Sequence, residues 1–237
     1  MMKMRPADER GASDLGWLDS RHTFSFAEYL DSNHMGFGPL RVINDDRVEA
    51  GGGFGTHGHN DMEIISYVLE GALKHEDSMG TGSLIRPGEV QRMSAGTGVL
   101  HSEFNGSDSE QVHFLQIWII PEQTGLQPGY EQKEFSVEER NGKWRLVGSP
   151  TGEDGSVTIR QDVRLFATLL TAGQSVEYSF TPGRKGWLHV CSGSLQIDSQ
   201  DAGEGDGFAV DGPEDVTLTG MSDAEVLLFD MVDIGAQ

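Results

Sequence analysis

The chain has 237 residues, with 17 Lys and Arg against 38 Asp and Glu, which gives a formal net charge of −21 at pH 7. A surface this acidic repels phosphate backbones, so direct binding to nucleic acid is disfavoured. The single cysteine, Cys191, excludes an internal disulfide framework and favours a reducing compartment. The length suits one large β domain or two small ones.

The beginning of the chain has no apolar segment of the kind that forms a secretion signal. No stretch anywhere approaches the roughly 18 apolar residues of a membrane span. We therefore expect a cytoplasmic protein with no membrane partner.

Short hydrophobic runs separated by glycine-containing turns follow one another along the chain. Residues 63–69, 112–119 and 225–230 are such runs, and the chain contains 32 glycines. Short strands with frequent turn signals predict an all-β sandwich or barrel. One short helix is predicted over residues 27–30, and residues 134–150 are predicted to be a polar connector with one possible strand.

Two pairs of potential metal ligands lie in the first half. His57 and His59 form one pair, and His101 and Glu103 form the other. Residues two apart on a β-strand point to the same face, whereas a helix needs a spacing of three or four. If the two strands are neighbours, three imidazoles and one carboxylate converge, which is a ligand set for one mononuclear metal.

Glu63 is an alternative source of the carboxylate. It follows His59 by four residues, which puts it on the same strand face by parity. A further possibility is that Glu63 accepts a hydrogen bond from an imidazole that holds the metal. Spacing alone does not choose between Glu63 and Glu103.

The chain matches itself at an offset of 122 residues, where Val68, Gly71 and Leu73 fall on Val190, Gly193 and Leu195. Two copies of a β domain explain this repeat, and we place them at residues 1–133 and 134–237. The second copy lacks every candidate ligand, because the positions opposite the four are occupied by Ser179, Thr181, Leu218 and Gly220. Metal is therefore expected only in the N-terminal copy.

Residues 51–71 read Gly-x5-His-x-His-x3-Glu-x7-Gly, and residues 96–105 read Gly-Thr-Gly-Val-Leu-His-x3-Asn. These segments resemble the two motifs of the cupins, a superfamily of small double-sheeted β-barrels with a metal in the mouth. Two departures are Gly71, one residue late, and Gly96, where cupins usually have Pro. Residues 16–29, 53–59, 67–71, 75–77 and 93–103 resemble one family in particular, the pirins.

The pirin resemblance is close from residue 3 to about residue 125, and the second half resembles the degenerate, metal-free second cupin of that family. It implies two tandem jelly-roll-like cupin barrels with metal in the first only. It also implies that His57, His59, His101 and Glu103 hold the ion, whereas cupins of other families use the glutamate of the first motif, here Glu63. One divalent ion per chain is expected, Fe²⁺ first, with Zn, Co, Ni, Cu or Mn also compatible with these ligands.

Bacterial pirins similar to this chain imply quercetin 2,3-dioxygenase activity, in which O₂ opens the central ring of a flavonol and CO is released. Three neutral imidazoles and one carboxylate leave a divalent ion with a net charge of about +1 and open coordination positions, which suits an ionised flavonol hydroxyl and O₂. Glu103 is the candidate general base. The alternative function is that of a metal- or redox-sensing regulator that acts through protein partners.

The remaining histidines are predicted to be surface or hydrogen-bonded core residues, although His22 lies in a pirin-like stretch and is also a candidate for lining the site. These residues are His22, His34, His75, His113 and His189. Some apolar residues are candidates for a pocket wall, although such residues at strand spacing more often belong to a core. They are Phe24, Phe26, Phe54, Met93 and Trp118.

Overall fold

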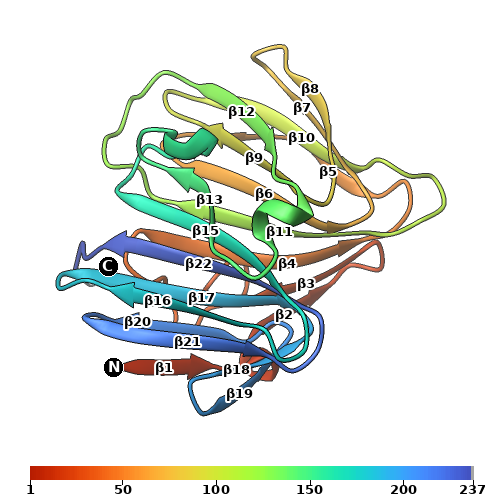
Figure 1. Ribbon diagram of the computed structural model, residues 1–237. Coiled ribbons are helices and arrows are strands. Elements are labelled where there is room, and N and C mark those ends of the chain that lie inside the picture. The colour runs from red at the N-terminus through yellow and green to blue at the C-terminus, as the bar shows by residue number, and fades with distance from the viewer. Residues whose placement is uncertain (236–237) are drawn as a thin grey trace.

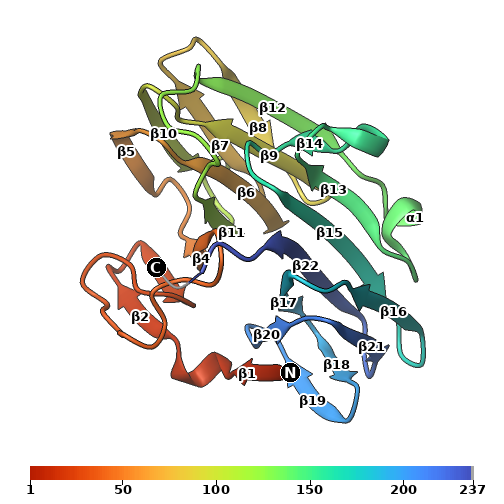
Figure 2. The same cartoon turned by 90° about the vertical axis from the view of Figure 1, so that its left-hand side faces the viewer.

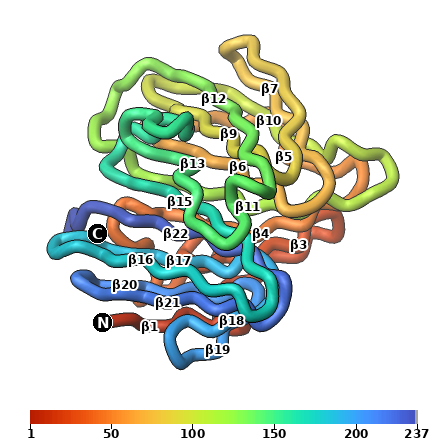
Figure 3. The backbone as a smooth tube through the Cα atoms, in the orientation of Figure 1, coloured from red at the N-terminus to blue at the C-terminus, as the bar shows by residue number. Residues whose placement is uncertain are grey.

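Two β-barrels of similar build lie side by side in the structure, a computed structural model that describes residues 1–235 (Figure 1). Within these residues each barrel pairs a seven-stranded sheet with a four-stranded sheet, so the all-β prediction is confirmed. The continuous backbone trace shows the chain starting at the edge of the lower barrel, then forming the upper barrel and returning to the lower one (Figure 3).

The first barrel contains the candidate ligands. Its large sheet has the order β12 (Gly129–Glu134), β9 (Glu89–Ser94), β6 (Glu63–Glu70), β11 (Val112–Ile119), β4 (Leu40–Val48), β3 (Leu18–His22) and β2 (Gly11–Asp14). Its small sheet has the order β5 (Gly53–His59), β10 (Val99–Asn105), β7 (Leu73–Asp77) and β8 (Gly82–Ile85).

The second barrel repeats this plan. Its large sheet has the order β1 (Met2–Arg5), β20 (Gly207–Asp211), β17 (Arg184–Ser192), β22 (Ala224–Val232), β15 (Val163–Leu170), β13 (Arg145–Ser149) and β14 (Val157–Thr158). Its small sheet has the order β16 (Ser175–Phe180), β21 (Glu214–Gly220), β18 (Ser194–Ile197) and β19 (Gln200–Gly203). Short helical segments are η1 (Ala7–Glu9), α1 (Val137–Arg140) and η2 (Glu153–Gly155).

The internal repeat is visible in the irregularities of matching strands. A β-bulge interrupts the pairing of β6 with β11 at Leu69, and another interrupts the pairing of β17 with β22 at Cys191, which lies 122 positions later. The glycines that follow, Gly71 and Gly193, have φ values of 74° and 76°. Both adopt the left-handed conformation that glycine reaches without steric cost. The predicted duplication is thus confirmed down to single residues.

The N-terminal strand belongs to the second barrel by its hydrogen bonds. β1 runs antiparallel to β20, with Met2 opposite Val210 and Arg5 opposite Gly207. The chain therefore covers the edge of β20 before it builds the first barrel, and β1 becomes the edge strand of that sheet.

Packing of the two large sheets creates a shared core. Figure 2 shows the small sheets on the outer sides of the molecule and the large sheets between them. Fully buried side chains from both halves meet there, among them Ile65, Tyr67 and Ile117 from the first barrel and Leu165, Trp187 and Phe229 from the second. The two barrels therefore share one continuous apolar interface, whose burial stabilises both.

A buried polar cluster also joins the halves. Arg140 donates through Nη1 to Glu225 Oε1 at 2.6 Å and to the Tyr67 hydroxyl at 2.9 Å, and the same hydroxyl donates to Glu225. Each buried charge is therefore paired, as burial requires.

The predicted helix at residues 27–30 is wrong. Phe26 and Tyr29 form an isolated β-bridge with two backbone hydrogen bonds, and Ala27 has a left-handed φ of 49°. A left-handed residue cannot continue a right-handed helix, so Ala27 excludes the predicted helical turn. In residues 134–150 the predicted connector contains α1, capped by Ser136 and Glu139, and the predicted strand is β13. Within residues 1–235, no helix has the length and apolarity needed to cross a membrane.

Phe229→Ala tests the shared core. Phe229 is 0% exposed and packs where the two barrels meet, so the cavity left behind should lower the free energy of unfolding by about 3–5 kcal/mol. Urea unfolding followed by fluorescence and circular dichroism should show one shifted transition for both barrels. Met221→Ala, at a side chain that is 57% exposed, is the control and should change stability by less than about 0.5 kcal/mol. Separate transitions for the two barrels would contradict a shared core.

Candidate metal centre

The strands that contain the two residue pairs are neighbours. β5 and β10 pair antiparallel, with His101 opposite His57 and Val99 opposite His59. The ring centroids of His57, His59 and His101 are 4.4 to 5.0 Å apart, and one nitrogen from each ring lies within 4.8 Å of the others. Three imidazoles from two adjacent strands therefore converge, as the spacing of two residues predicts.

The pairing of β10 with β5 contains a β-bulge between His101 and Glu103. Beyond it Glu103 pairs with Phe54, and a Cβ atom on Gly53 would lie 2.5 Å from the backbone oxygen of Glu103, so the close approach requires glycine. His57 Nδ1 donates to the backbone oxygen of Gly55 at 2.8 Å. This bond fixes the ring and leaves Nε2 as the atom available to a metal.

His101 is a candidate metal ligand because it lies buried against the rings of His57 and His59. Its side chain is 2% exposed, and neither ring nitrogen has a hydrogen-bond partner in the described protein. Burial, with the neighbouring histidines, lowers the pKa of His101 to about 3 and that of His59 to about 4. Both rings are consequently neutral near pH 7, so each keeps a nitrogen lone pair that a divalent ion can bind. A bound ion would also give the buried nitrogen of His101 a partner.

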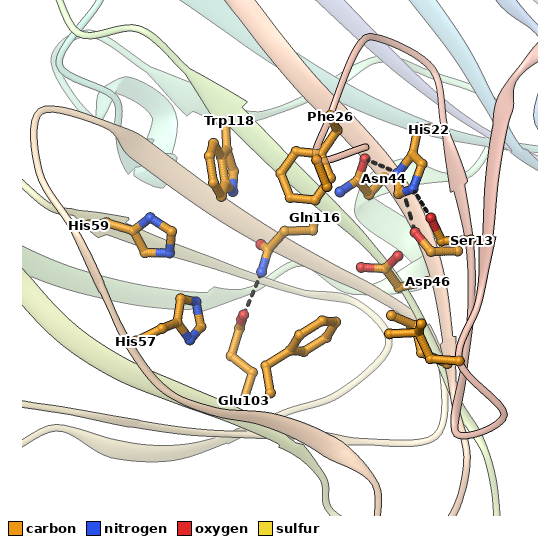
Figure 4. Close-up of a pocket in the computed structure, with 15 residues that line it drawn as sticks. Ser13, His22, Phe26, Asn44, Asp46, His57, His59, Glu103, Gln116 and Trp118 are labelled. Carbon is orange, nitrogen blue, oxygen red and sulfur yellow. Dashed lines mark hydrogen bonds between the residues drawn. The ribbon is translucent and has the colours of Figure 1, made fainter. Parts of the chain in front are cut away.

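Glu103 is buried in a polar setting inside the barrel, and it forms a group of potential ligand atoms within 4.8 Å with His75 and His101 and not with His57 and His59. The Ser66 hydroxyl donates to Oε1 at 2.9 Å, and Gln116 Nε2 donates to Oε2 at 2.5 Å (Figure 4). Burial raises the pKa of Glu103 to about 7, although both hydrogen bonds favour the ionised form. A carboxylate has about four lone-pair positions, so acceptance of these two bonds still leaves positions for a metal.

His75 lies next to this cluster. It stands opposite Glu103 in the pairing of β7 with β10, and potential ligand atoms of His75, His101 and Glu103 also lie within 4.8 Å of one another. Its Nε2 is 3.1 Å from Asp77 Oδ2, and its side chain is fully buried. His75 is thus a hydrogen-bonded core histidine, as predicted, but one in contact with the site.

Glu63 does not lie at the cluster, and the parity argument that made it an alternative to Glu103 is wrong. A turn with Asp61 at a φ of 48° separates β5 from β6, so the two strands belong to different sheets and parity does not carry across. The Glu63 carboxylate accepts from the backbone N–H of Arg160 at 3.1 Å, on the side of the shared core. It neither reaches the imidazoles nor accepts a hydrogen bond from one.

An apolar cavity opens in front of the cluster, with a volume of about 200 Å³. His57, His59 and Glu103 form one side of it, and the aromatic walls are Phe26, Phe54 and Trp118 (Figure 4). Three of the five candidate wall residues thus line the cavity, although a core position was the favoured expectation, and Phe24 and Met93 lie in buried cores as that expectation has it. His22 also lines the cavity, as its position in the sequence suggested.

Two of the other histidines are paired with carboxylates, and a third is buried without a partner among the described residues. His34 Nδ1 is 2.7 Å from Asp31, and His113 Nε2 is 2.7 Å from Asp45. His189 is buried with no partner for either ring nitrogen among the described residues, so the expectation of a surface or hydrogen-bonded residue is wrong there. Burial lowers the pKa of His189 to about 3, which keeps the ring neutral.

Sequence reasoning missed the polar residues that face the cavity from the large sheet. These residues are Ser66, Gln116, Asn44 and Asp46. Gln116 and Ser66 each interrupt an apolar run at a position whose alternate neighbours are buried, and that interruption was the available signal. The partner of each could not be read from the chain, because it lies on a different strand.

Two barrels of paired large and small sheets, with a histidine cluster in the mouth of the first, define a two-domain cupin protein. Residues 3–119 match the family model described as Pirin, and residues 146–231 match the model described as Quercetinase C-terminal cupin domain. The chain belongs to the pirin family.

Two relatives show how far the similarity extends. A protein of Escherichia coli strain K12 named quercetin 2,3-dioxygenase is 48% identical over 231 residues, which cover 98% of this chain and 99% of that protein. The crystal structure of the bacterial pirin YhhW from Escherichia coli, in complex with nickel(II), matches with a TM-score of 0.93 and 46% identity, covering 99% of this chain and 100% of that one. Similarity therefore spans both barrels.

Elemental analysis of two variants tests the placement of the glutamates and histidines. Glu63→Gln should retain the metal content of the unmodified protein, because its side chain points away from the cluster. His101→Ala should lower that content at least about tenfold, since it removes one of three convergent imidazoles. Loss of metal in Glu63→Gln at an unchanged melting temperature would contradict this geometry.

Proposed function

We propose that this chain is a metal-dependent dioxygenase that cleaves flavonols such as quercetin with O₂ and releases CO. One divalent ion per chain would be held by His57, His59, His101 and Glu103, with Fe²⁺ as the first candidate and Ni, Co, Mn, Cu and Zn as alternatives of the same ligand preference. When bound, the ion would supply the Lewis-acid and redox chemistry that the reaction with O₂ needs. The observation that carries the proposal is a cluster of three imidazoles beside an aromatic-walled cavity, which His57, His59 and the buried carboxyl of Glu103 line.

Glu103 is proposed to take the proton of the flavonol 3-hydroxyl. Its carboxyl group lines the cavity in which the flavonol would bind, which gives a general base access to the proton. Ser66 and Gln116 hold the two oxygens from the large sheet, so the carboxylate keeps its orientation toward the imidazoles. A carboxylate that both contacts the ion and accepts this proton must loosen from the ion when protonated.

The cavity suits a planar aromatic substrate. Trp118 meets His59 edge to face with ring centroids 4.8 Å apart, and Phe26 meets Trp118 in the same way at 5.4 Å. Ring edges and faces of this kind bind aromatic molecules by stacking and dispersion. The relative from Escherichia coli named quercetin 2,3-dioxygenase supports the same choice of substrate.

Quercetin turnover by protein loaded with each metal tests the proposal. Anaerobic mixing should leave the flavonol intact, and admission of O₂ should bleach its absorbance with release of one CO per molecule. Glu103→Gln should lower kcat by about 10²–10⁴-fold, since it removes the base, while Glu63→Gln should cleave quercetin at the unmodified rate.

The dioxygenase proposal is contradicted if no metal form shows O₂-dependent bleaching or release of CO. Stoichiometric capture of a protein partner that depends on the oxidation state of the metal would then favour the regulatory function instead.

Gln116→Leu tests the orientation of Glu103 separately from its chemistry. Leucine has a similar volume but cannot donate to Glu103 Oε2, and loss of a hydrogen bond to a metal-binding carboxylate lowers activity or metal affinity by about 10–100-fold. The expected result is a lower kcat at saturating metal with KM for quercetin within about threefold. Unchanged kcat in this variant would show that the hydrogen bond has no part in positioning Glu103.

A further inference from the structure

A second unsatisfied group lies in the cavity, away from the imidazoles. Asp46 on β4 is 3% exposed and lines the cavity, and its Oδ1 has no hydrogen-bond partner among the described residues. Figure 4 places it across the cavity from His57 and His59. An unpaired buried carboxyl oxygen is costly, and structures seldom retain one without a ligand or another compensating group.

The surroundings of Asp46 favour its protonated form. Burial foremost, with the charges of Asp45, Glu103 and Asp19, raises its pKa to about 7, and a hydrogen bond from Ser20 opposes that shift. Asp46 near neutral pH therefore exists in both protonation states, so it can accept a hydrogen bond or donate one.

The polar neighbours of Asp46 are already engaged. His22 Nδ1 is 2.8 Å from Asn44 Oδ1, and His22 Nε2 is 2.9 Å from the Ser13 hydroxyl. Gln116 is held by Glu103 and Ser66. Asp46 thus offers an open hydrogen-bonding position at this end of the cavity, in a rigid frame of β-strands.

We infer that Asp46 binds a hydroxyl group on the substrate ring that lies away from the metal, so that the site selects flavonols hydroxylated beyond the 3-hydroxyl and 4-carbonyl pair. This inference rests on the proposed function, which supplies the metal-bound end of the substrate. A second unpaired group, the Trp118 indole N–H, lines the same cavity and would favour an oxygen-rich ligand in the same way. A polyphenol would satisfy both groups, whereas an unsubstituted hydrocarbon ring would leave them buried and unpaired.

Anaerobic titration of the metal-loaded protein with two flavonols tests this role. Quercetin and 3-hydroxyflavone share the 3-hydroxyl and 4-carbonyl, and 3-hydroxyflavone lacks every other hydroxyl. The unmodified protein should bind quercetin at least about tenfold more tightly. Asp46→Leu should weaken quercetin binding about tenfold, the size expected for one lost hydrogen bond, and should leave binding of 3-hydroxyflavone within about twofold.

Asp46→Asn is the conservative variant, because its amide still forms hydrogen bonds, and it should weaken quercetin binding by about two- to fivefold. It also provides the measurement if the leucine variant does not fold. Glu28→Gln removes an exposed acid from the loop beside the cavity and should change neither affinity. Melting temperature and metal content confirm that the variants compared are intact.

Equal weakening of both flavonols in Asp46→Leu, or an unchanged ratio of the two affinities, would overturn the inference and leave the dioxygenase proposal standing. Binding with the predicted dependence on Asp46 but no consumption on admission of O₂ would support the inference and overturn the dioxygenase. Failure of the unmodified protein to bind either flavonol would overturn both.

Discussion

Strand alternation in the large sheet of the first barrel is the constraint on which the rest of the molecule depends. On β11, Leu115, Ile117 and Ile119 point into the shared core, while the residues between them point into the barrel. The same strand therefore carries the interface with the second barrel on one face and the floor of the site on the other. A register shift of one residue would exchange the two faces and destroy both.

The two barrels divide stability and chemistry between them. The interior of the second barrel is filled by a single apolar core, in which Val176 and Leu218 face each other across β16 and β21. In the first barrel the apolar interior is split into two smaller clusters, with the polar site residues between them. Buried, incompletely paired groups such as His101 and Asp46 lower stability where they lie, and the shared core offsets that loss.

Much of this architecture was predictable from sequence, for reasons that can be named. The two pairs of potential ligands were readable because residues two apart on a strand point to the same face, and the repeat was readable because apolar residues and a glycine recur at an offset of 122 residues. Prediction failed where the chain changes direction. The turn after His59 invalidated the parity argument for Glu63, and the roles of Gln116 and Asp46 depend on partners from strands distant in sequence.

We propose that the imidazole cluster and the aromatic cavity form one site, with a metal at one end and a polyphenol ring extending from it. An anaerobic crystal structure of the metal-loaded protein with quercetin is the sharpest test. We expect one ion on His57, His59, His101 and Glu103, with the flavonol between Phe54 and Trp118 and a ring hydroxyl at Asp46. An ion held by His75, His101 and Glu103 without His57 and His59, or a flavonol bound outside this cavity, would contradict it.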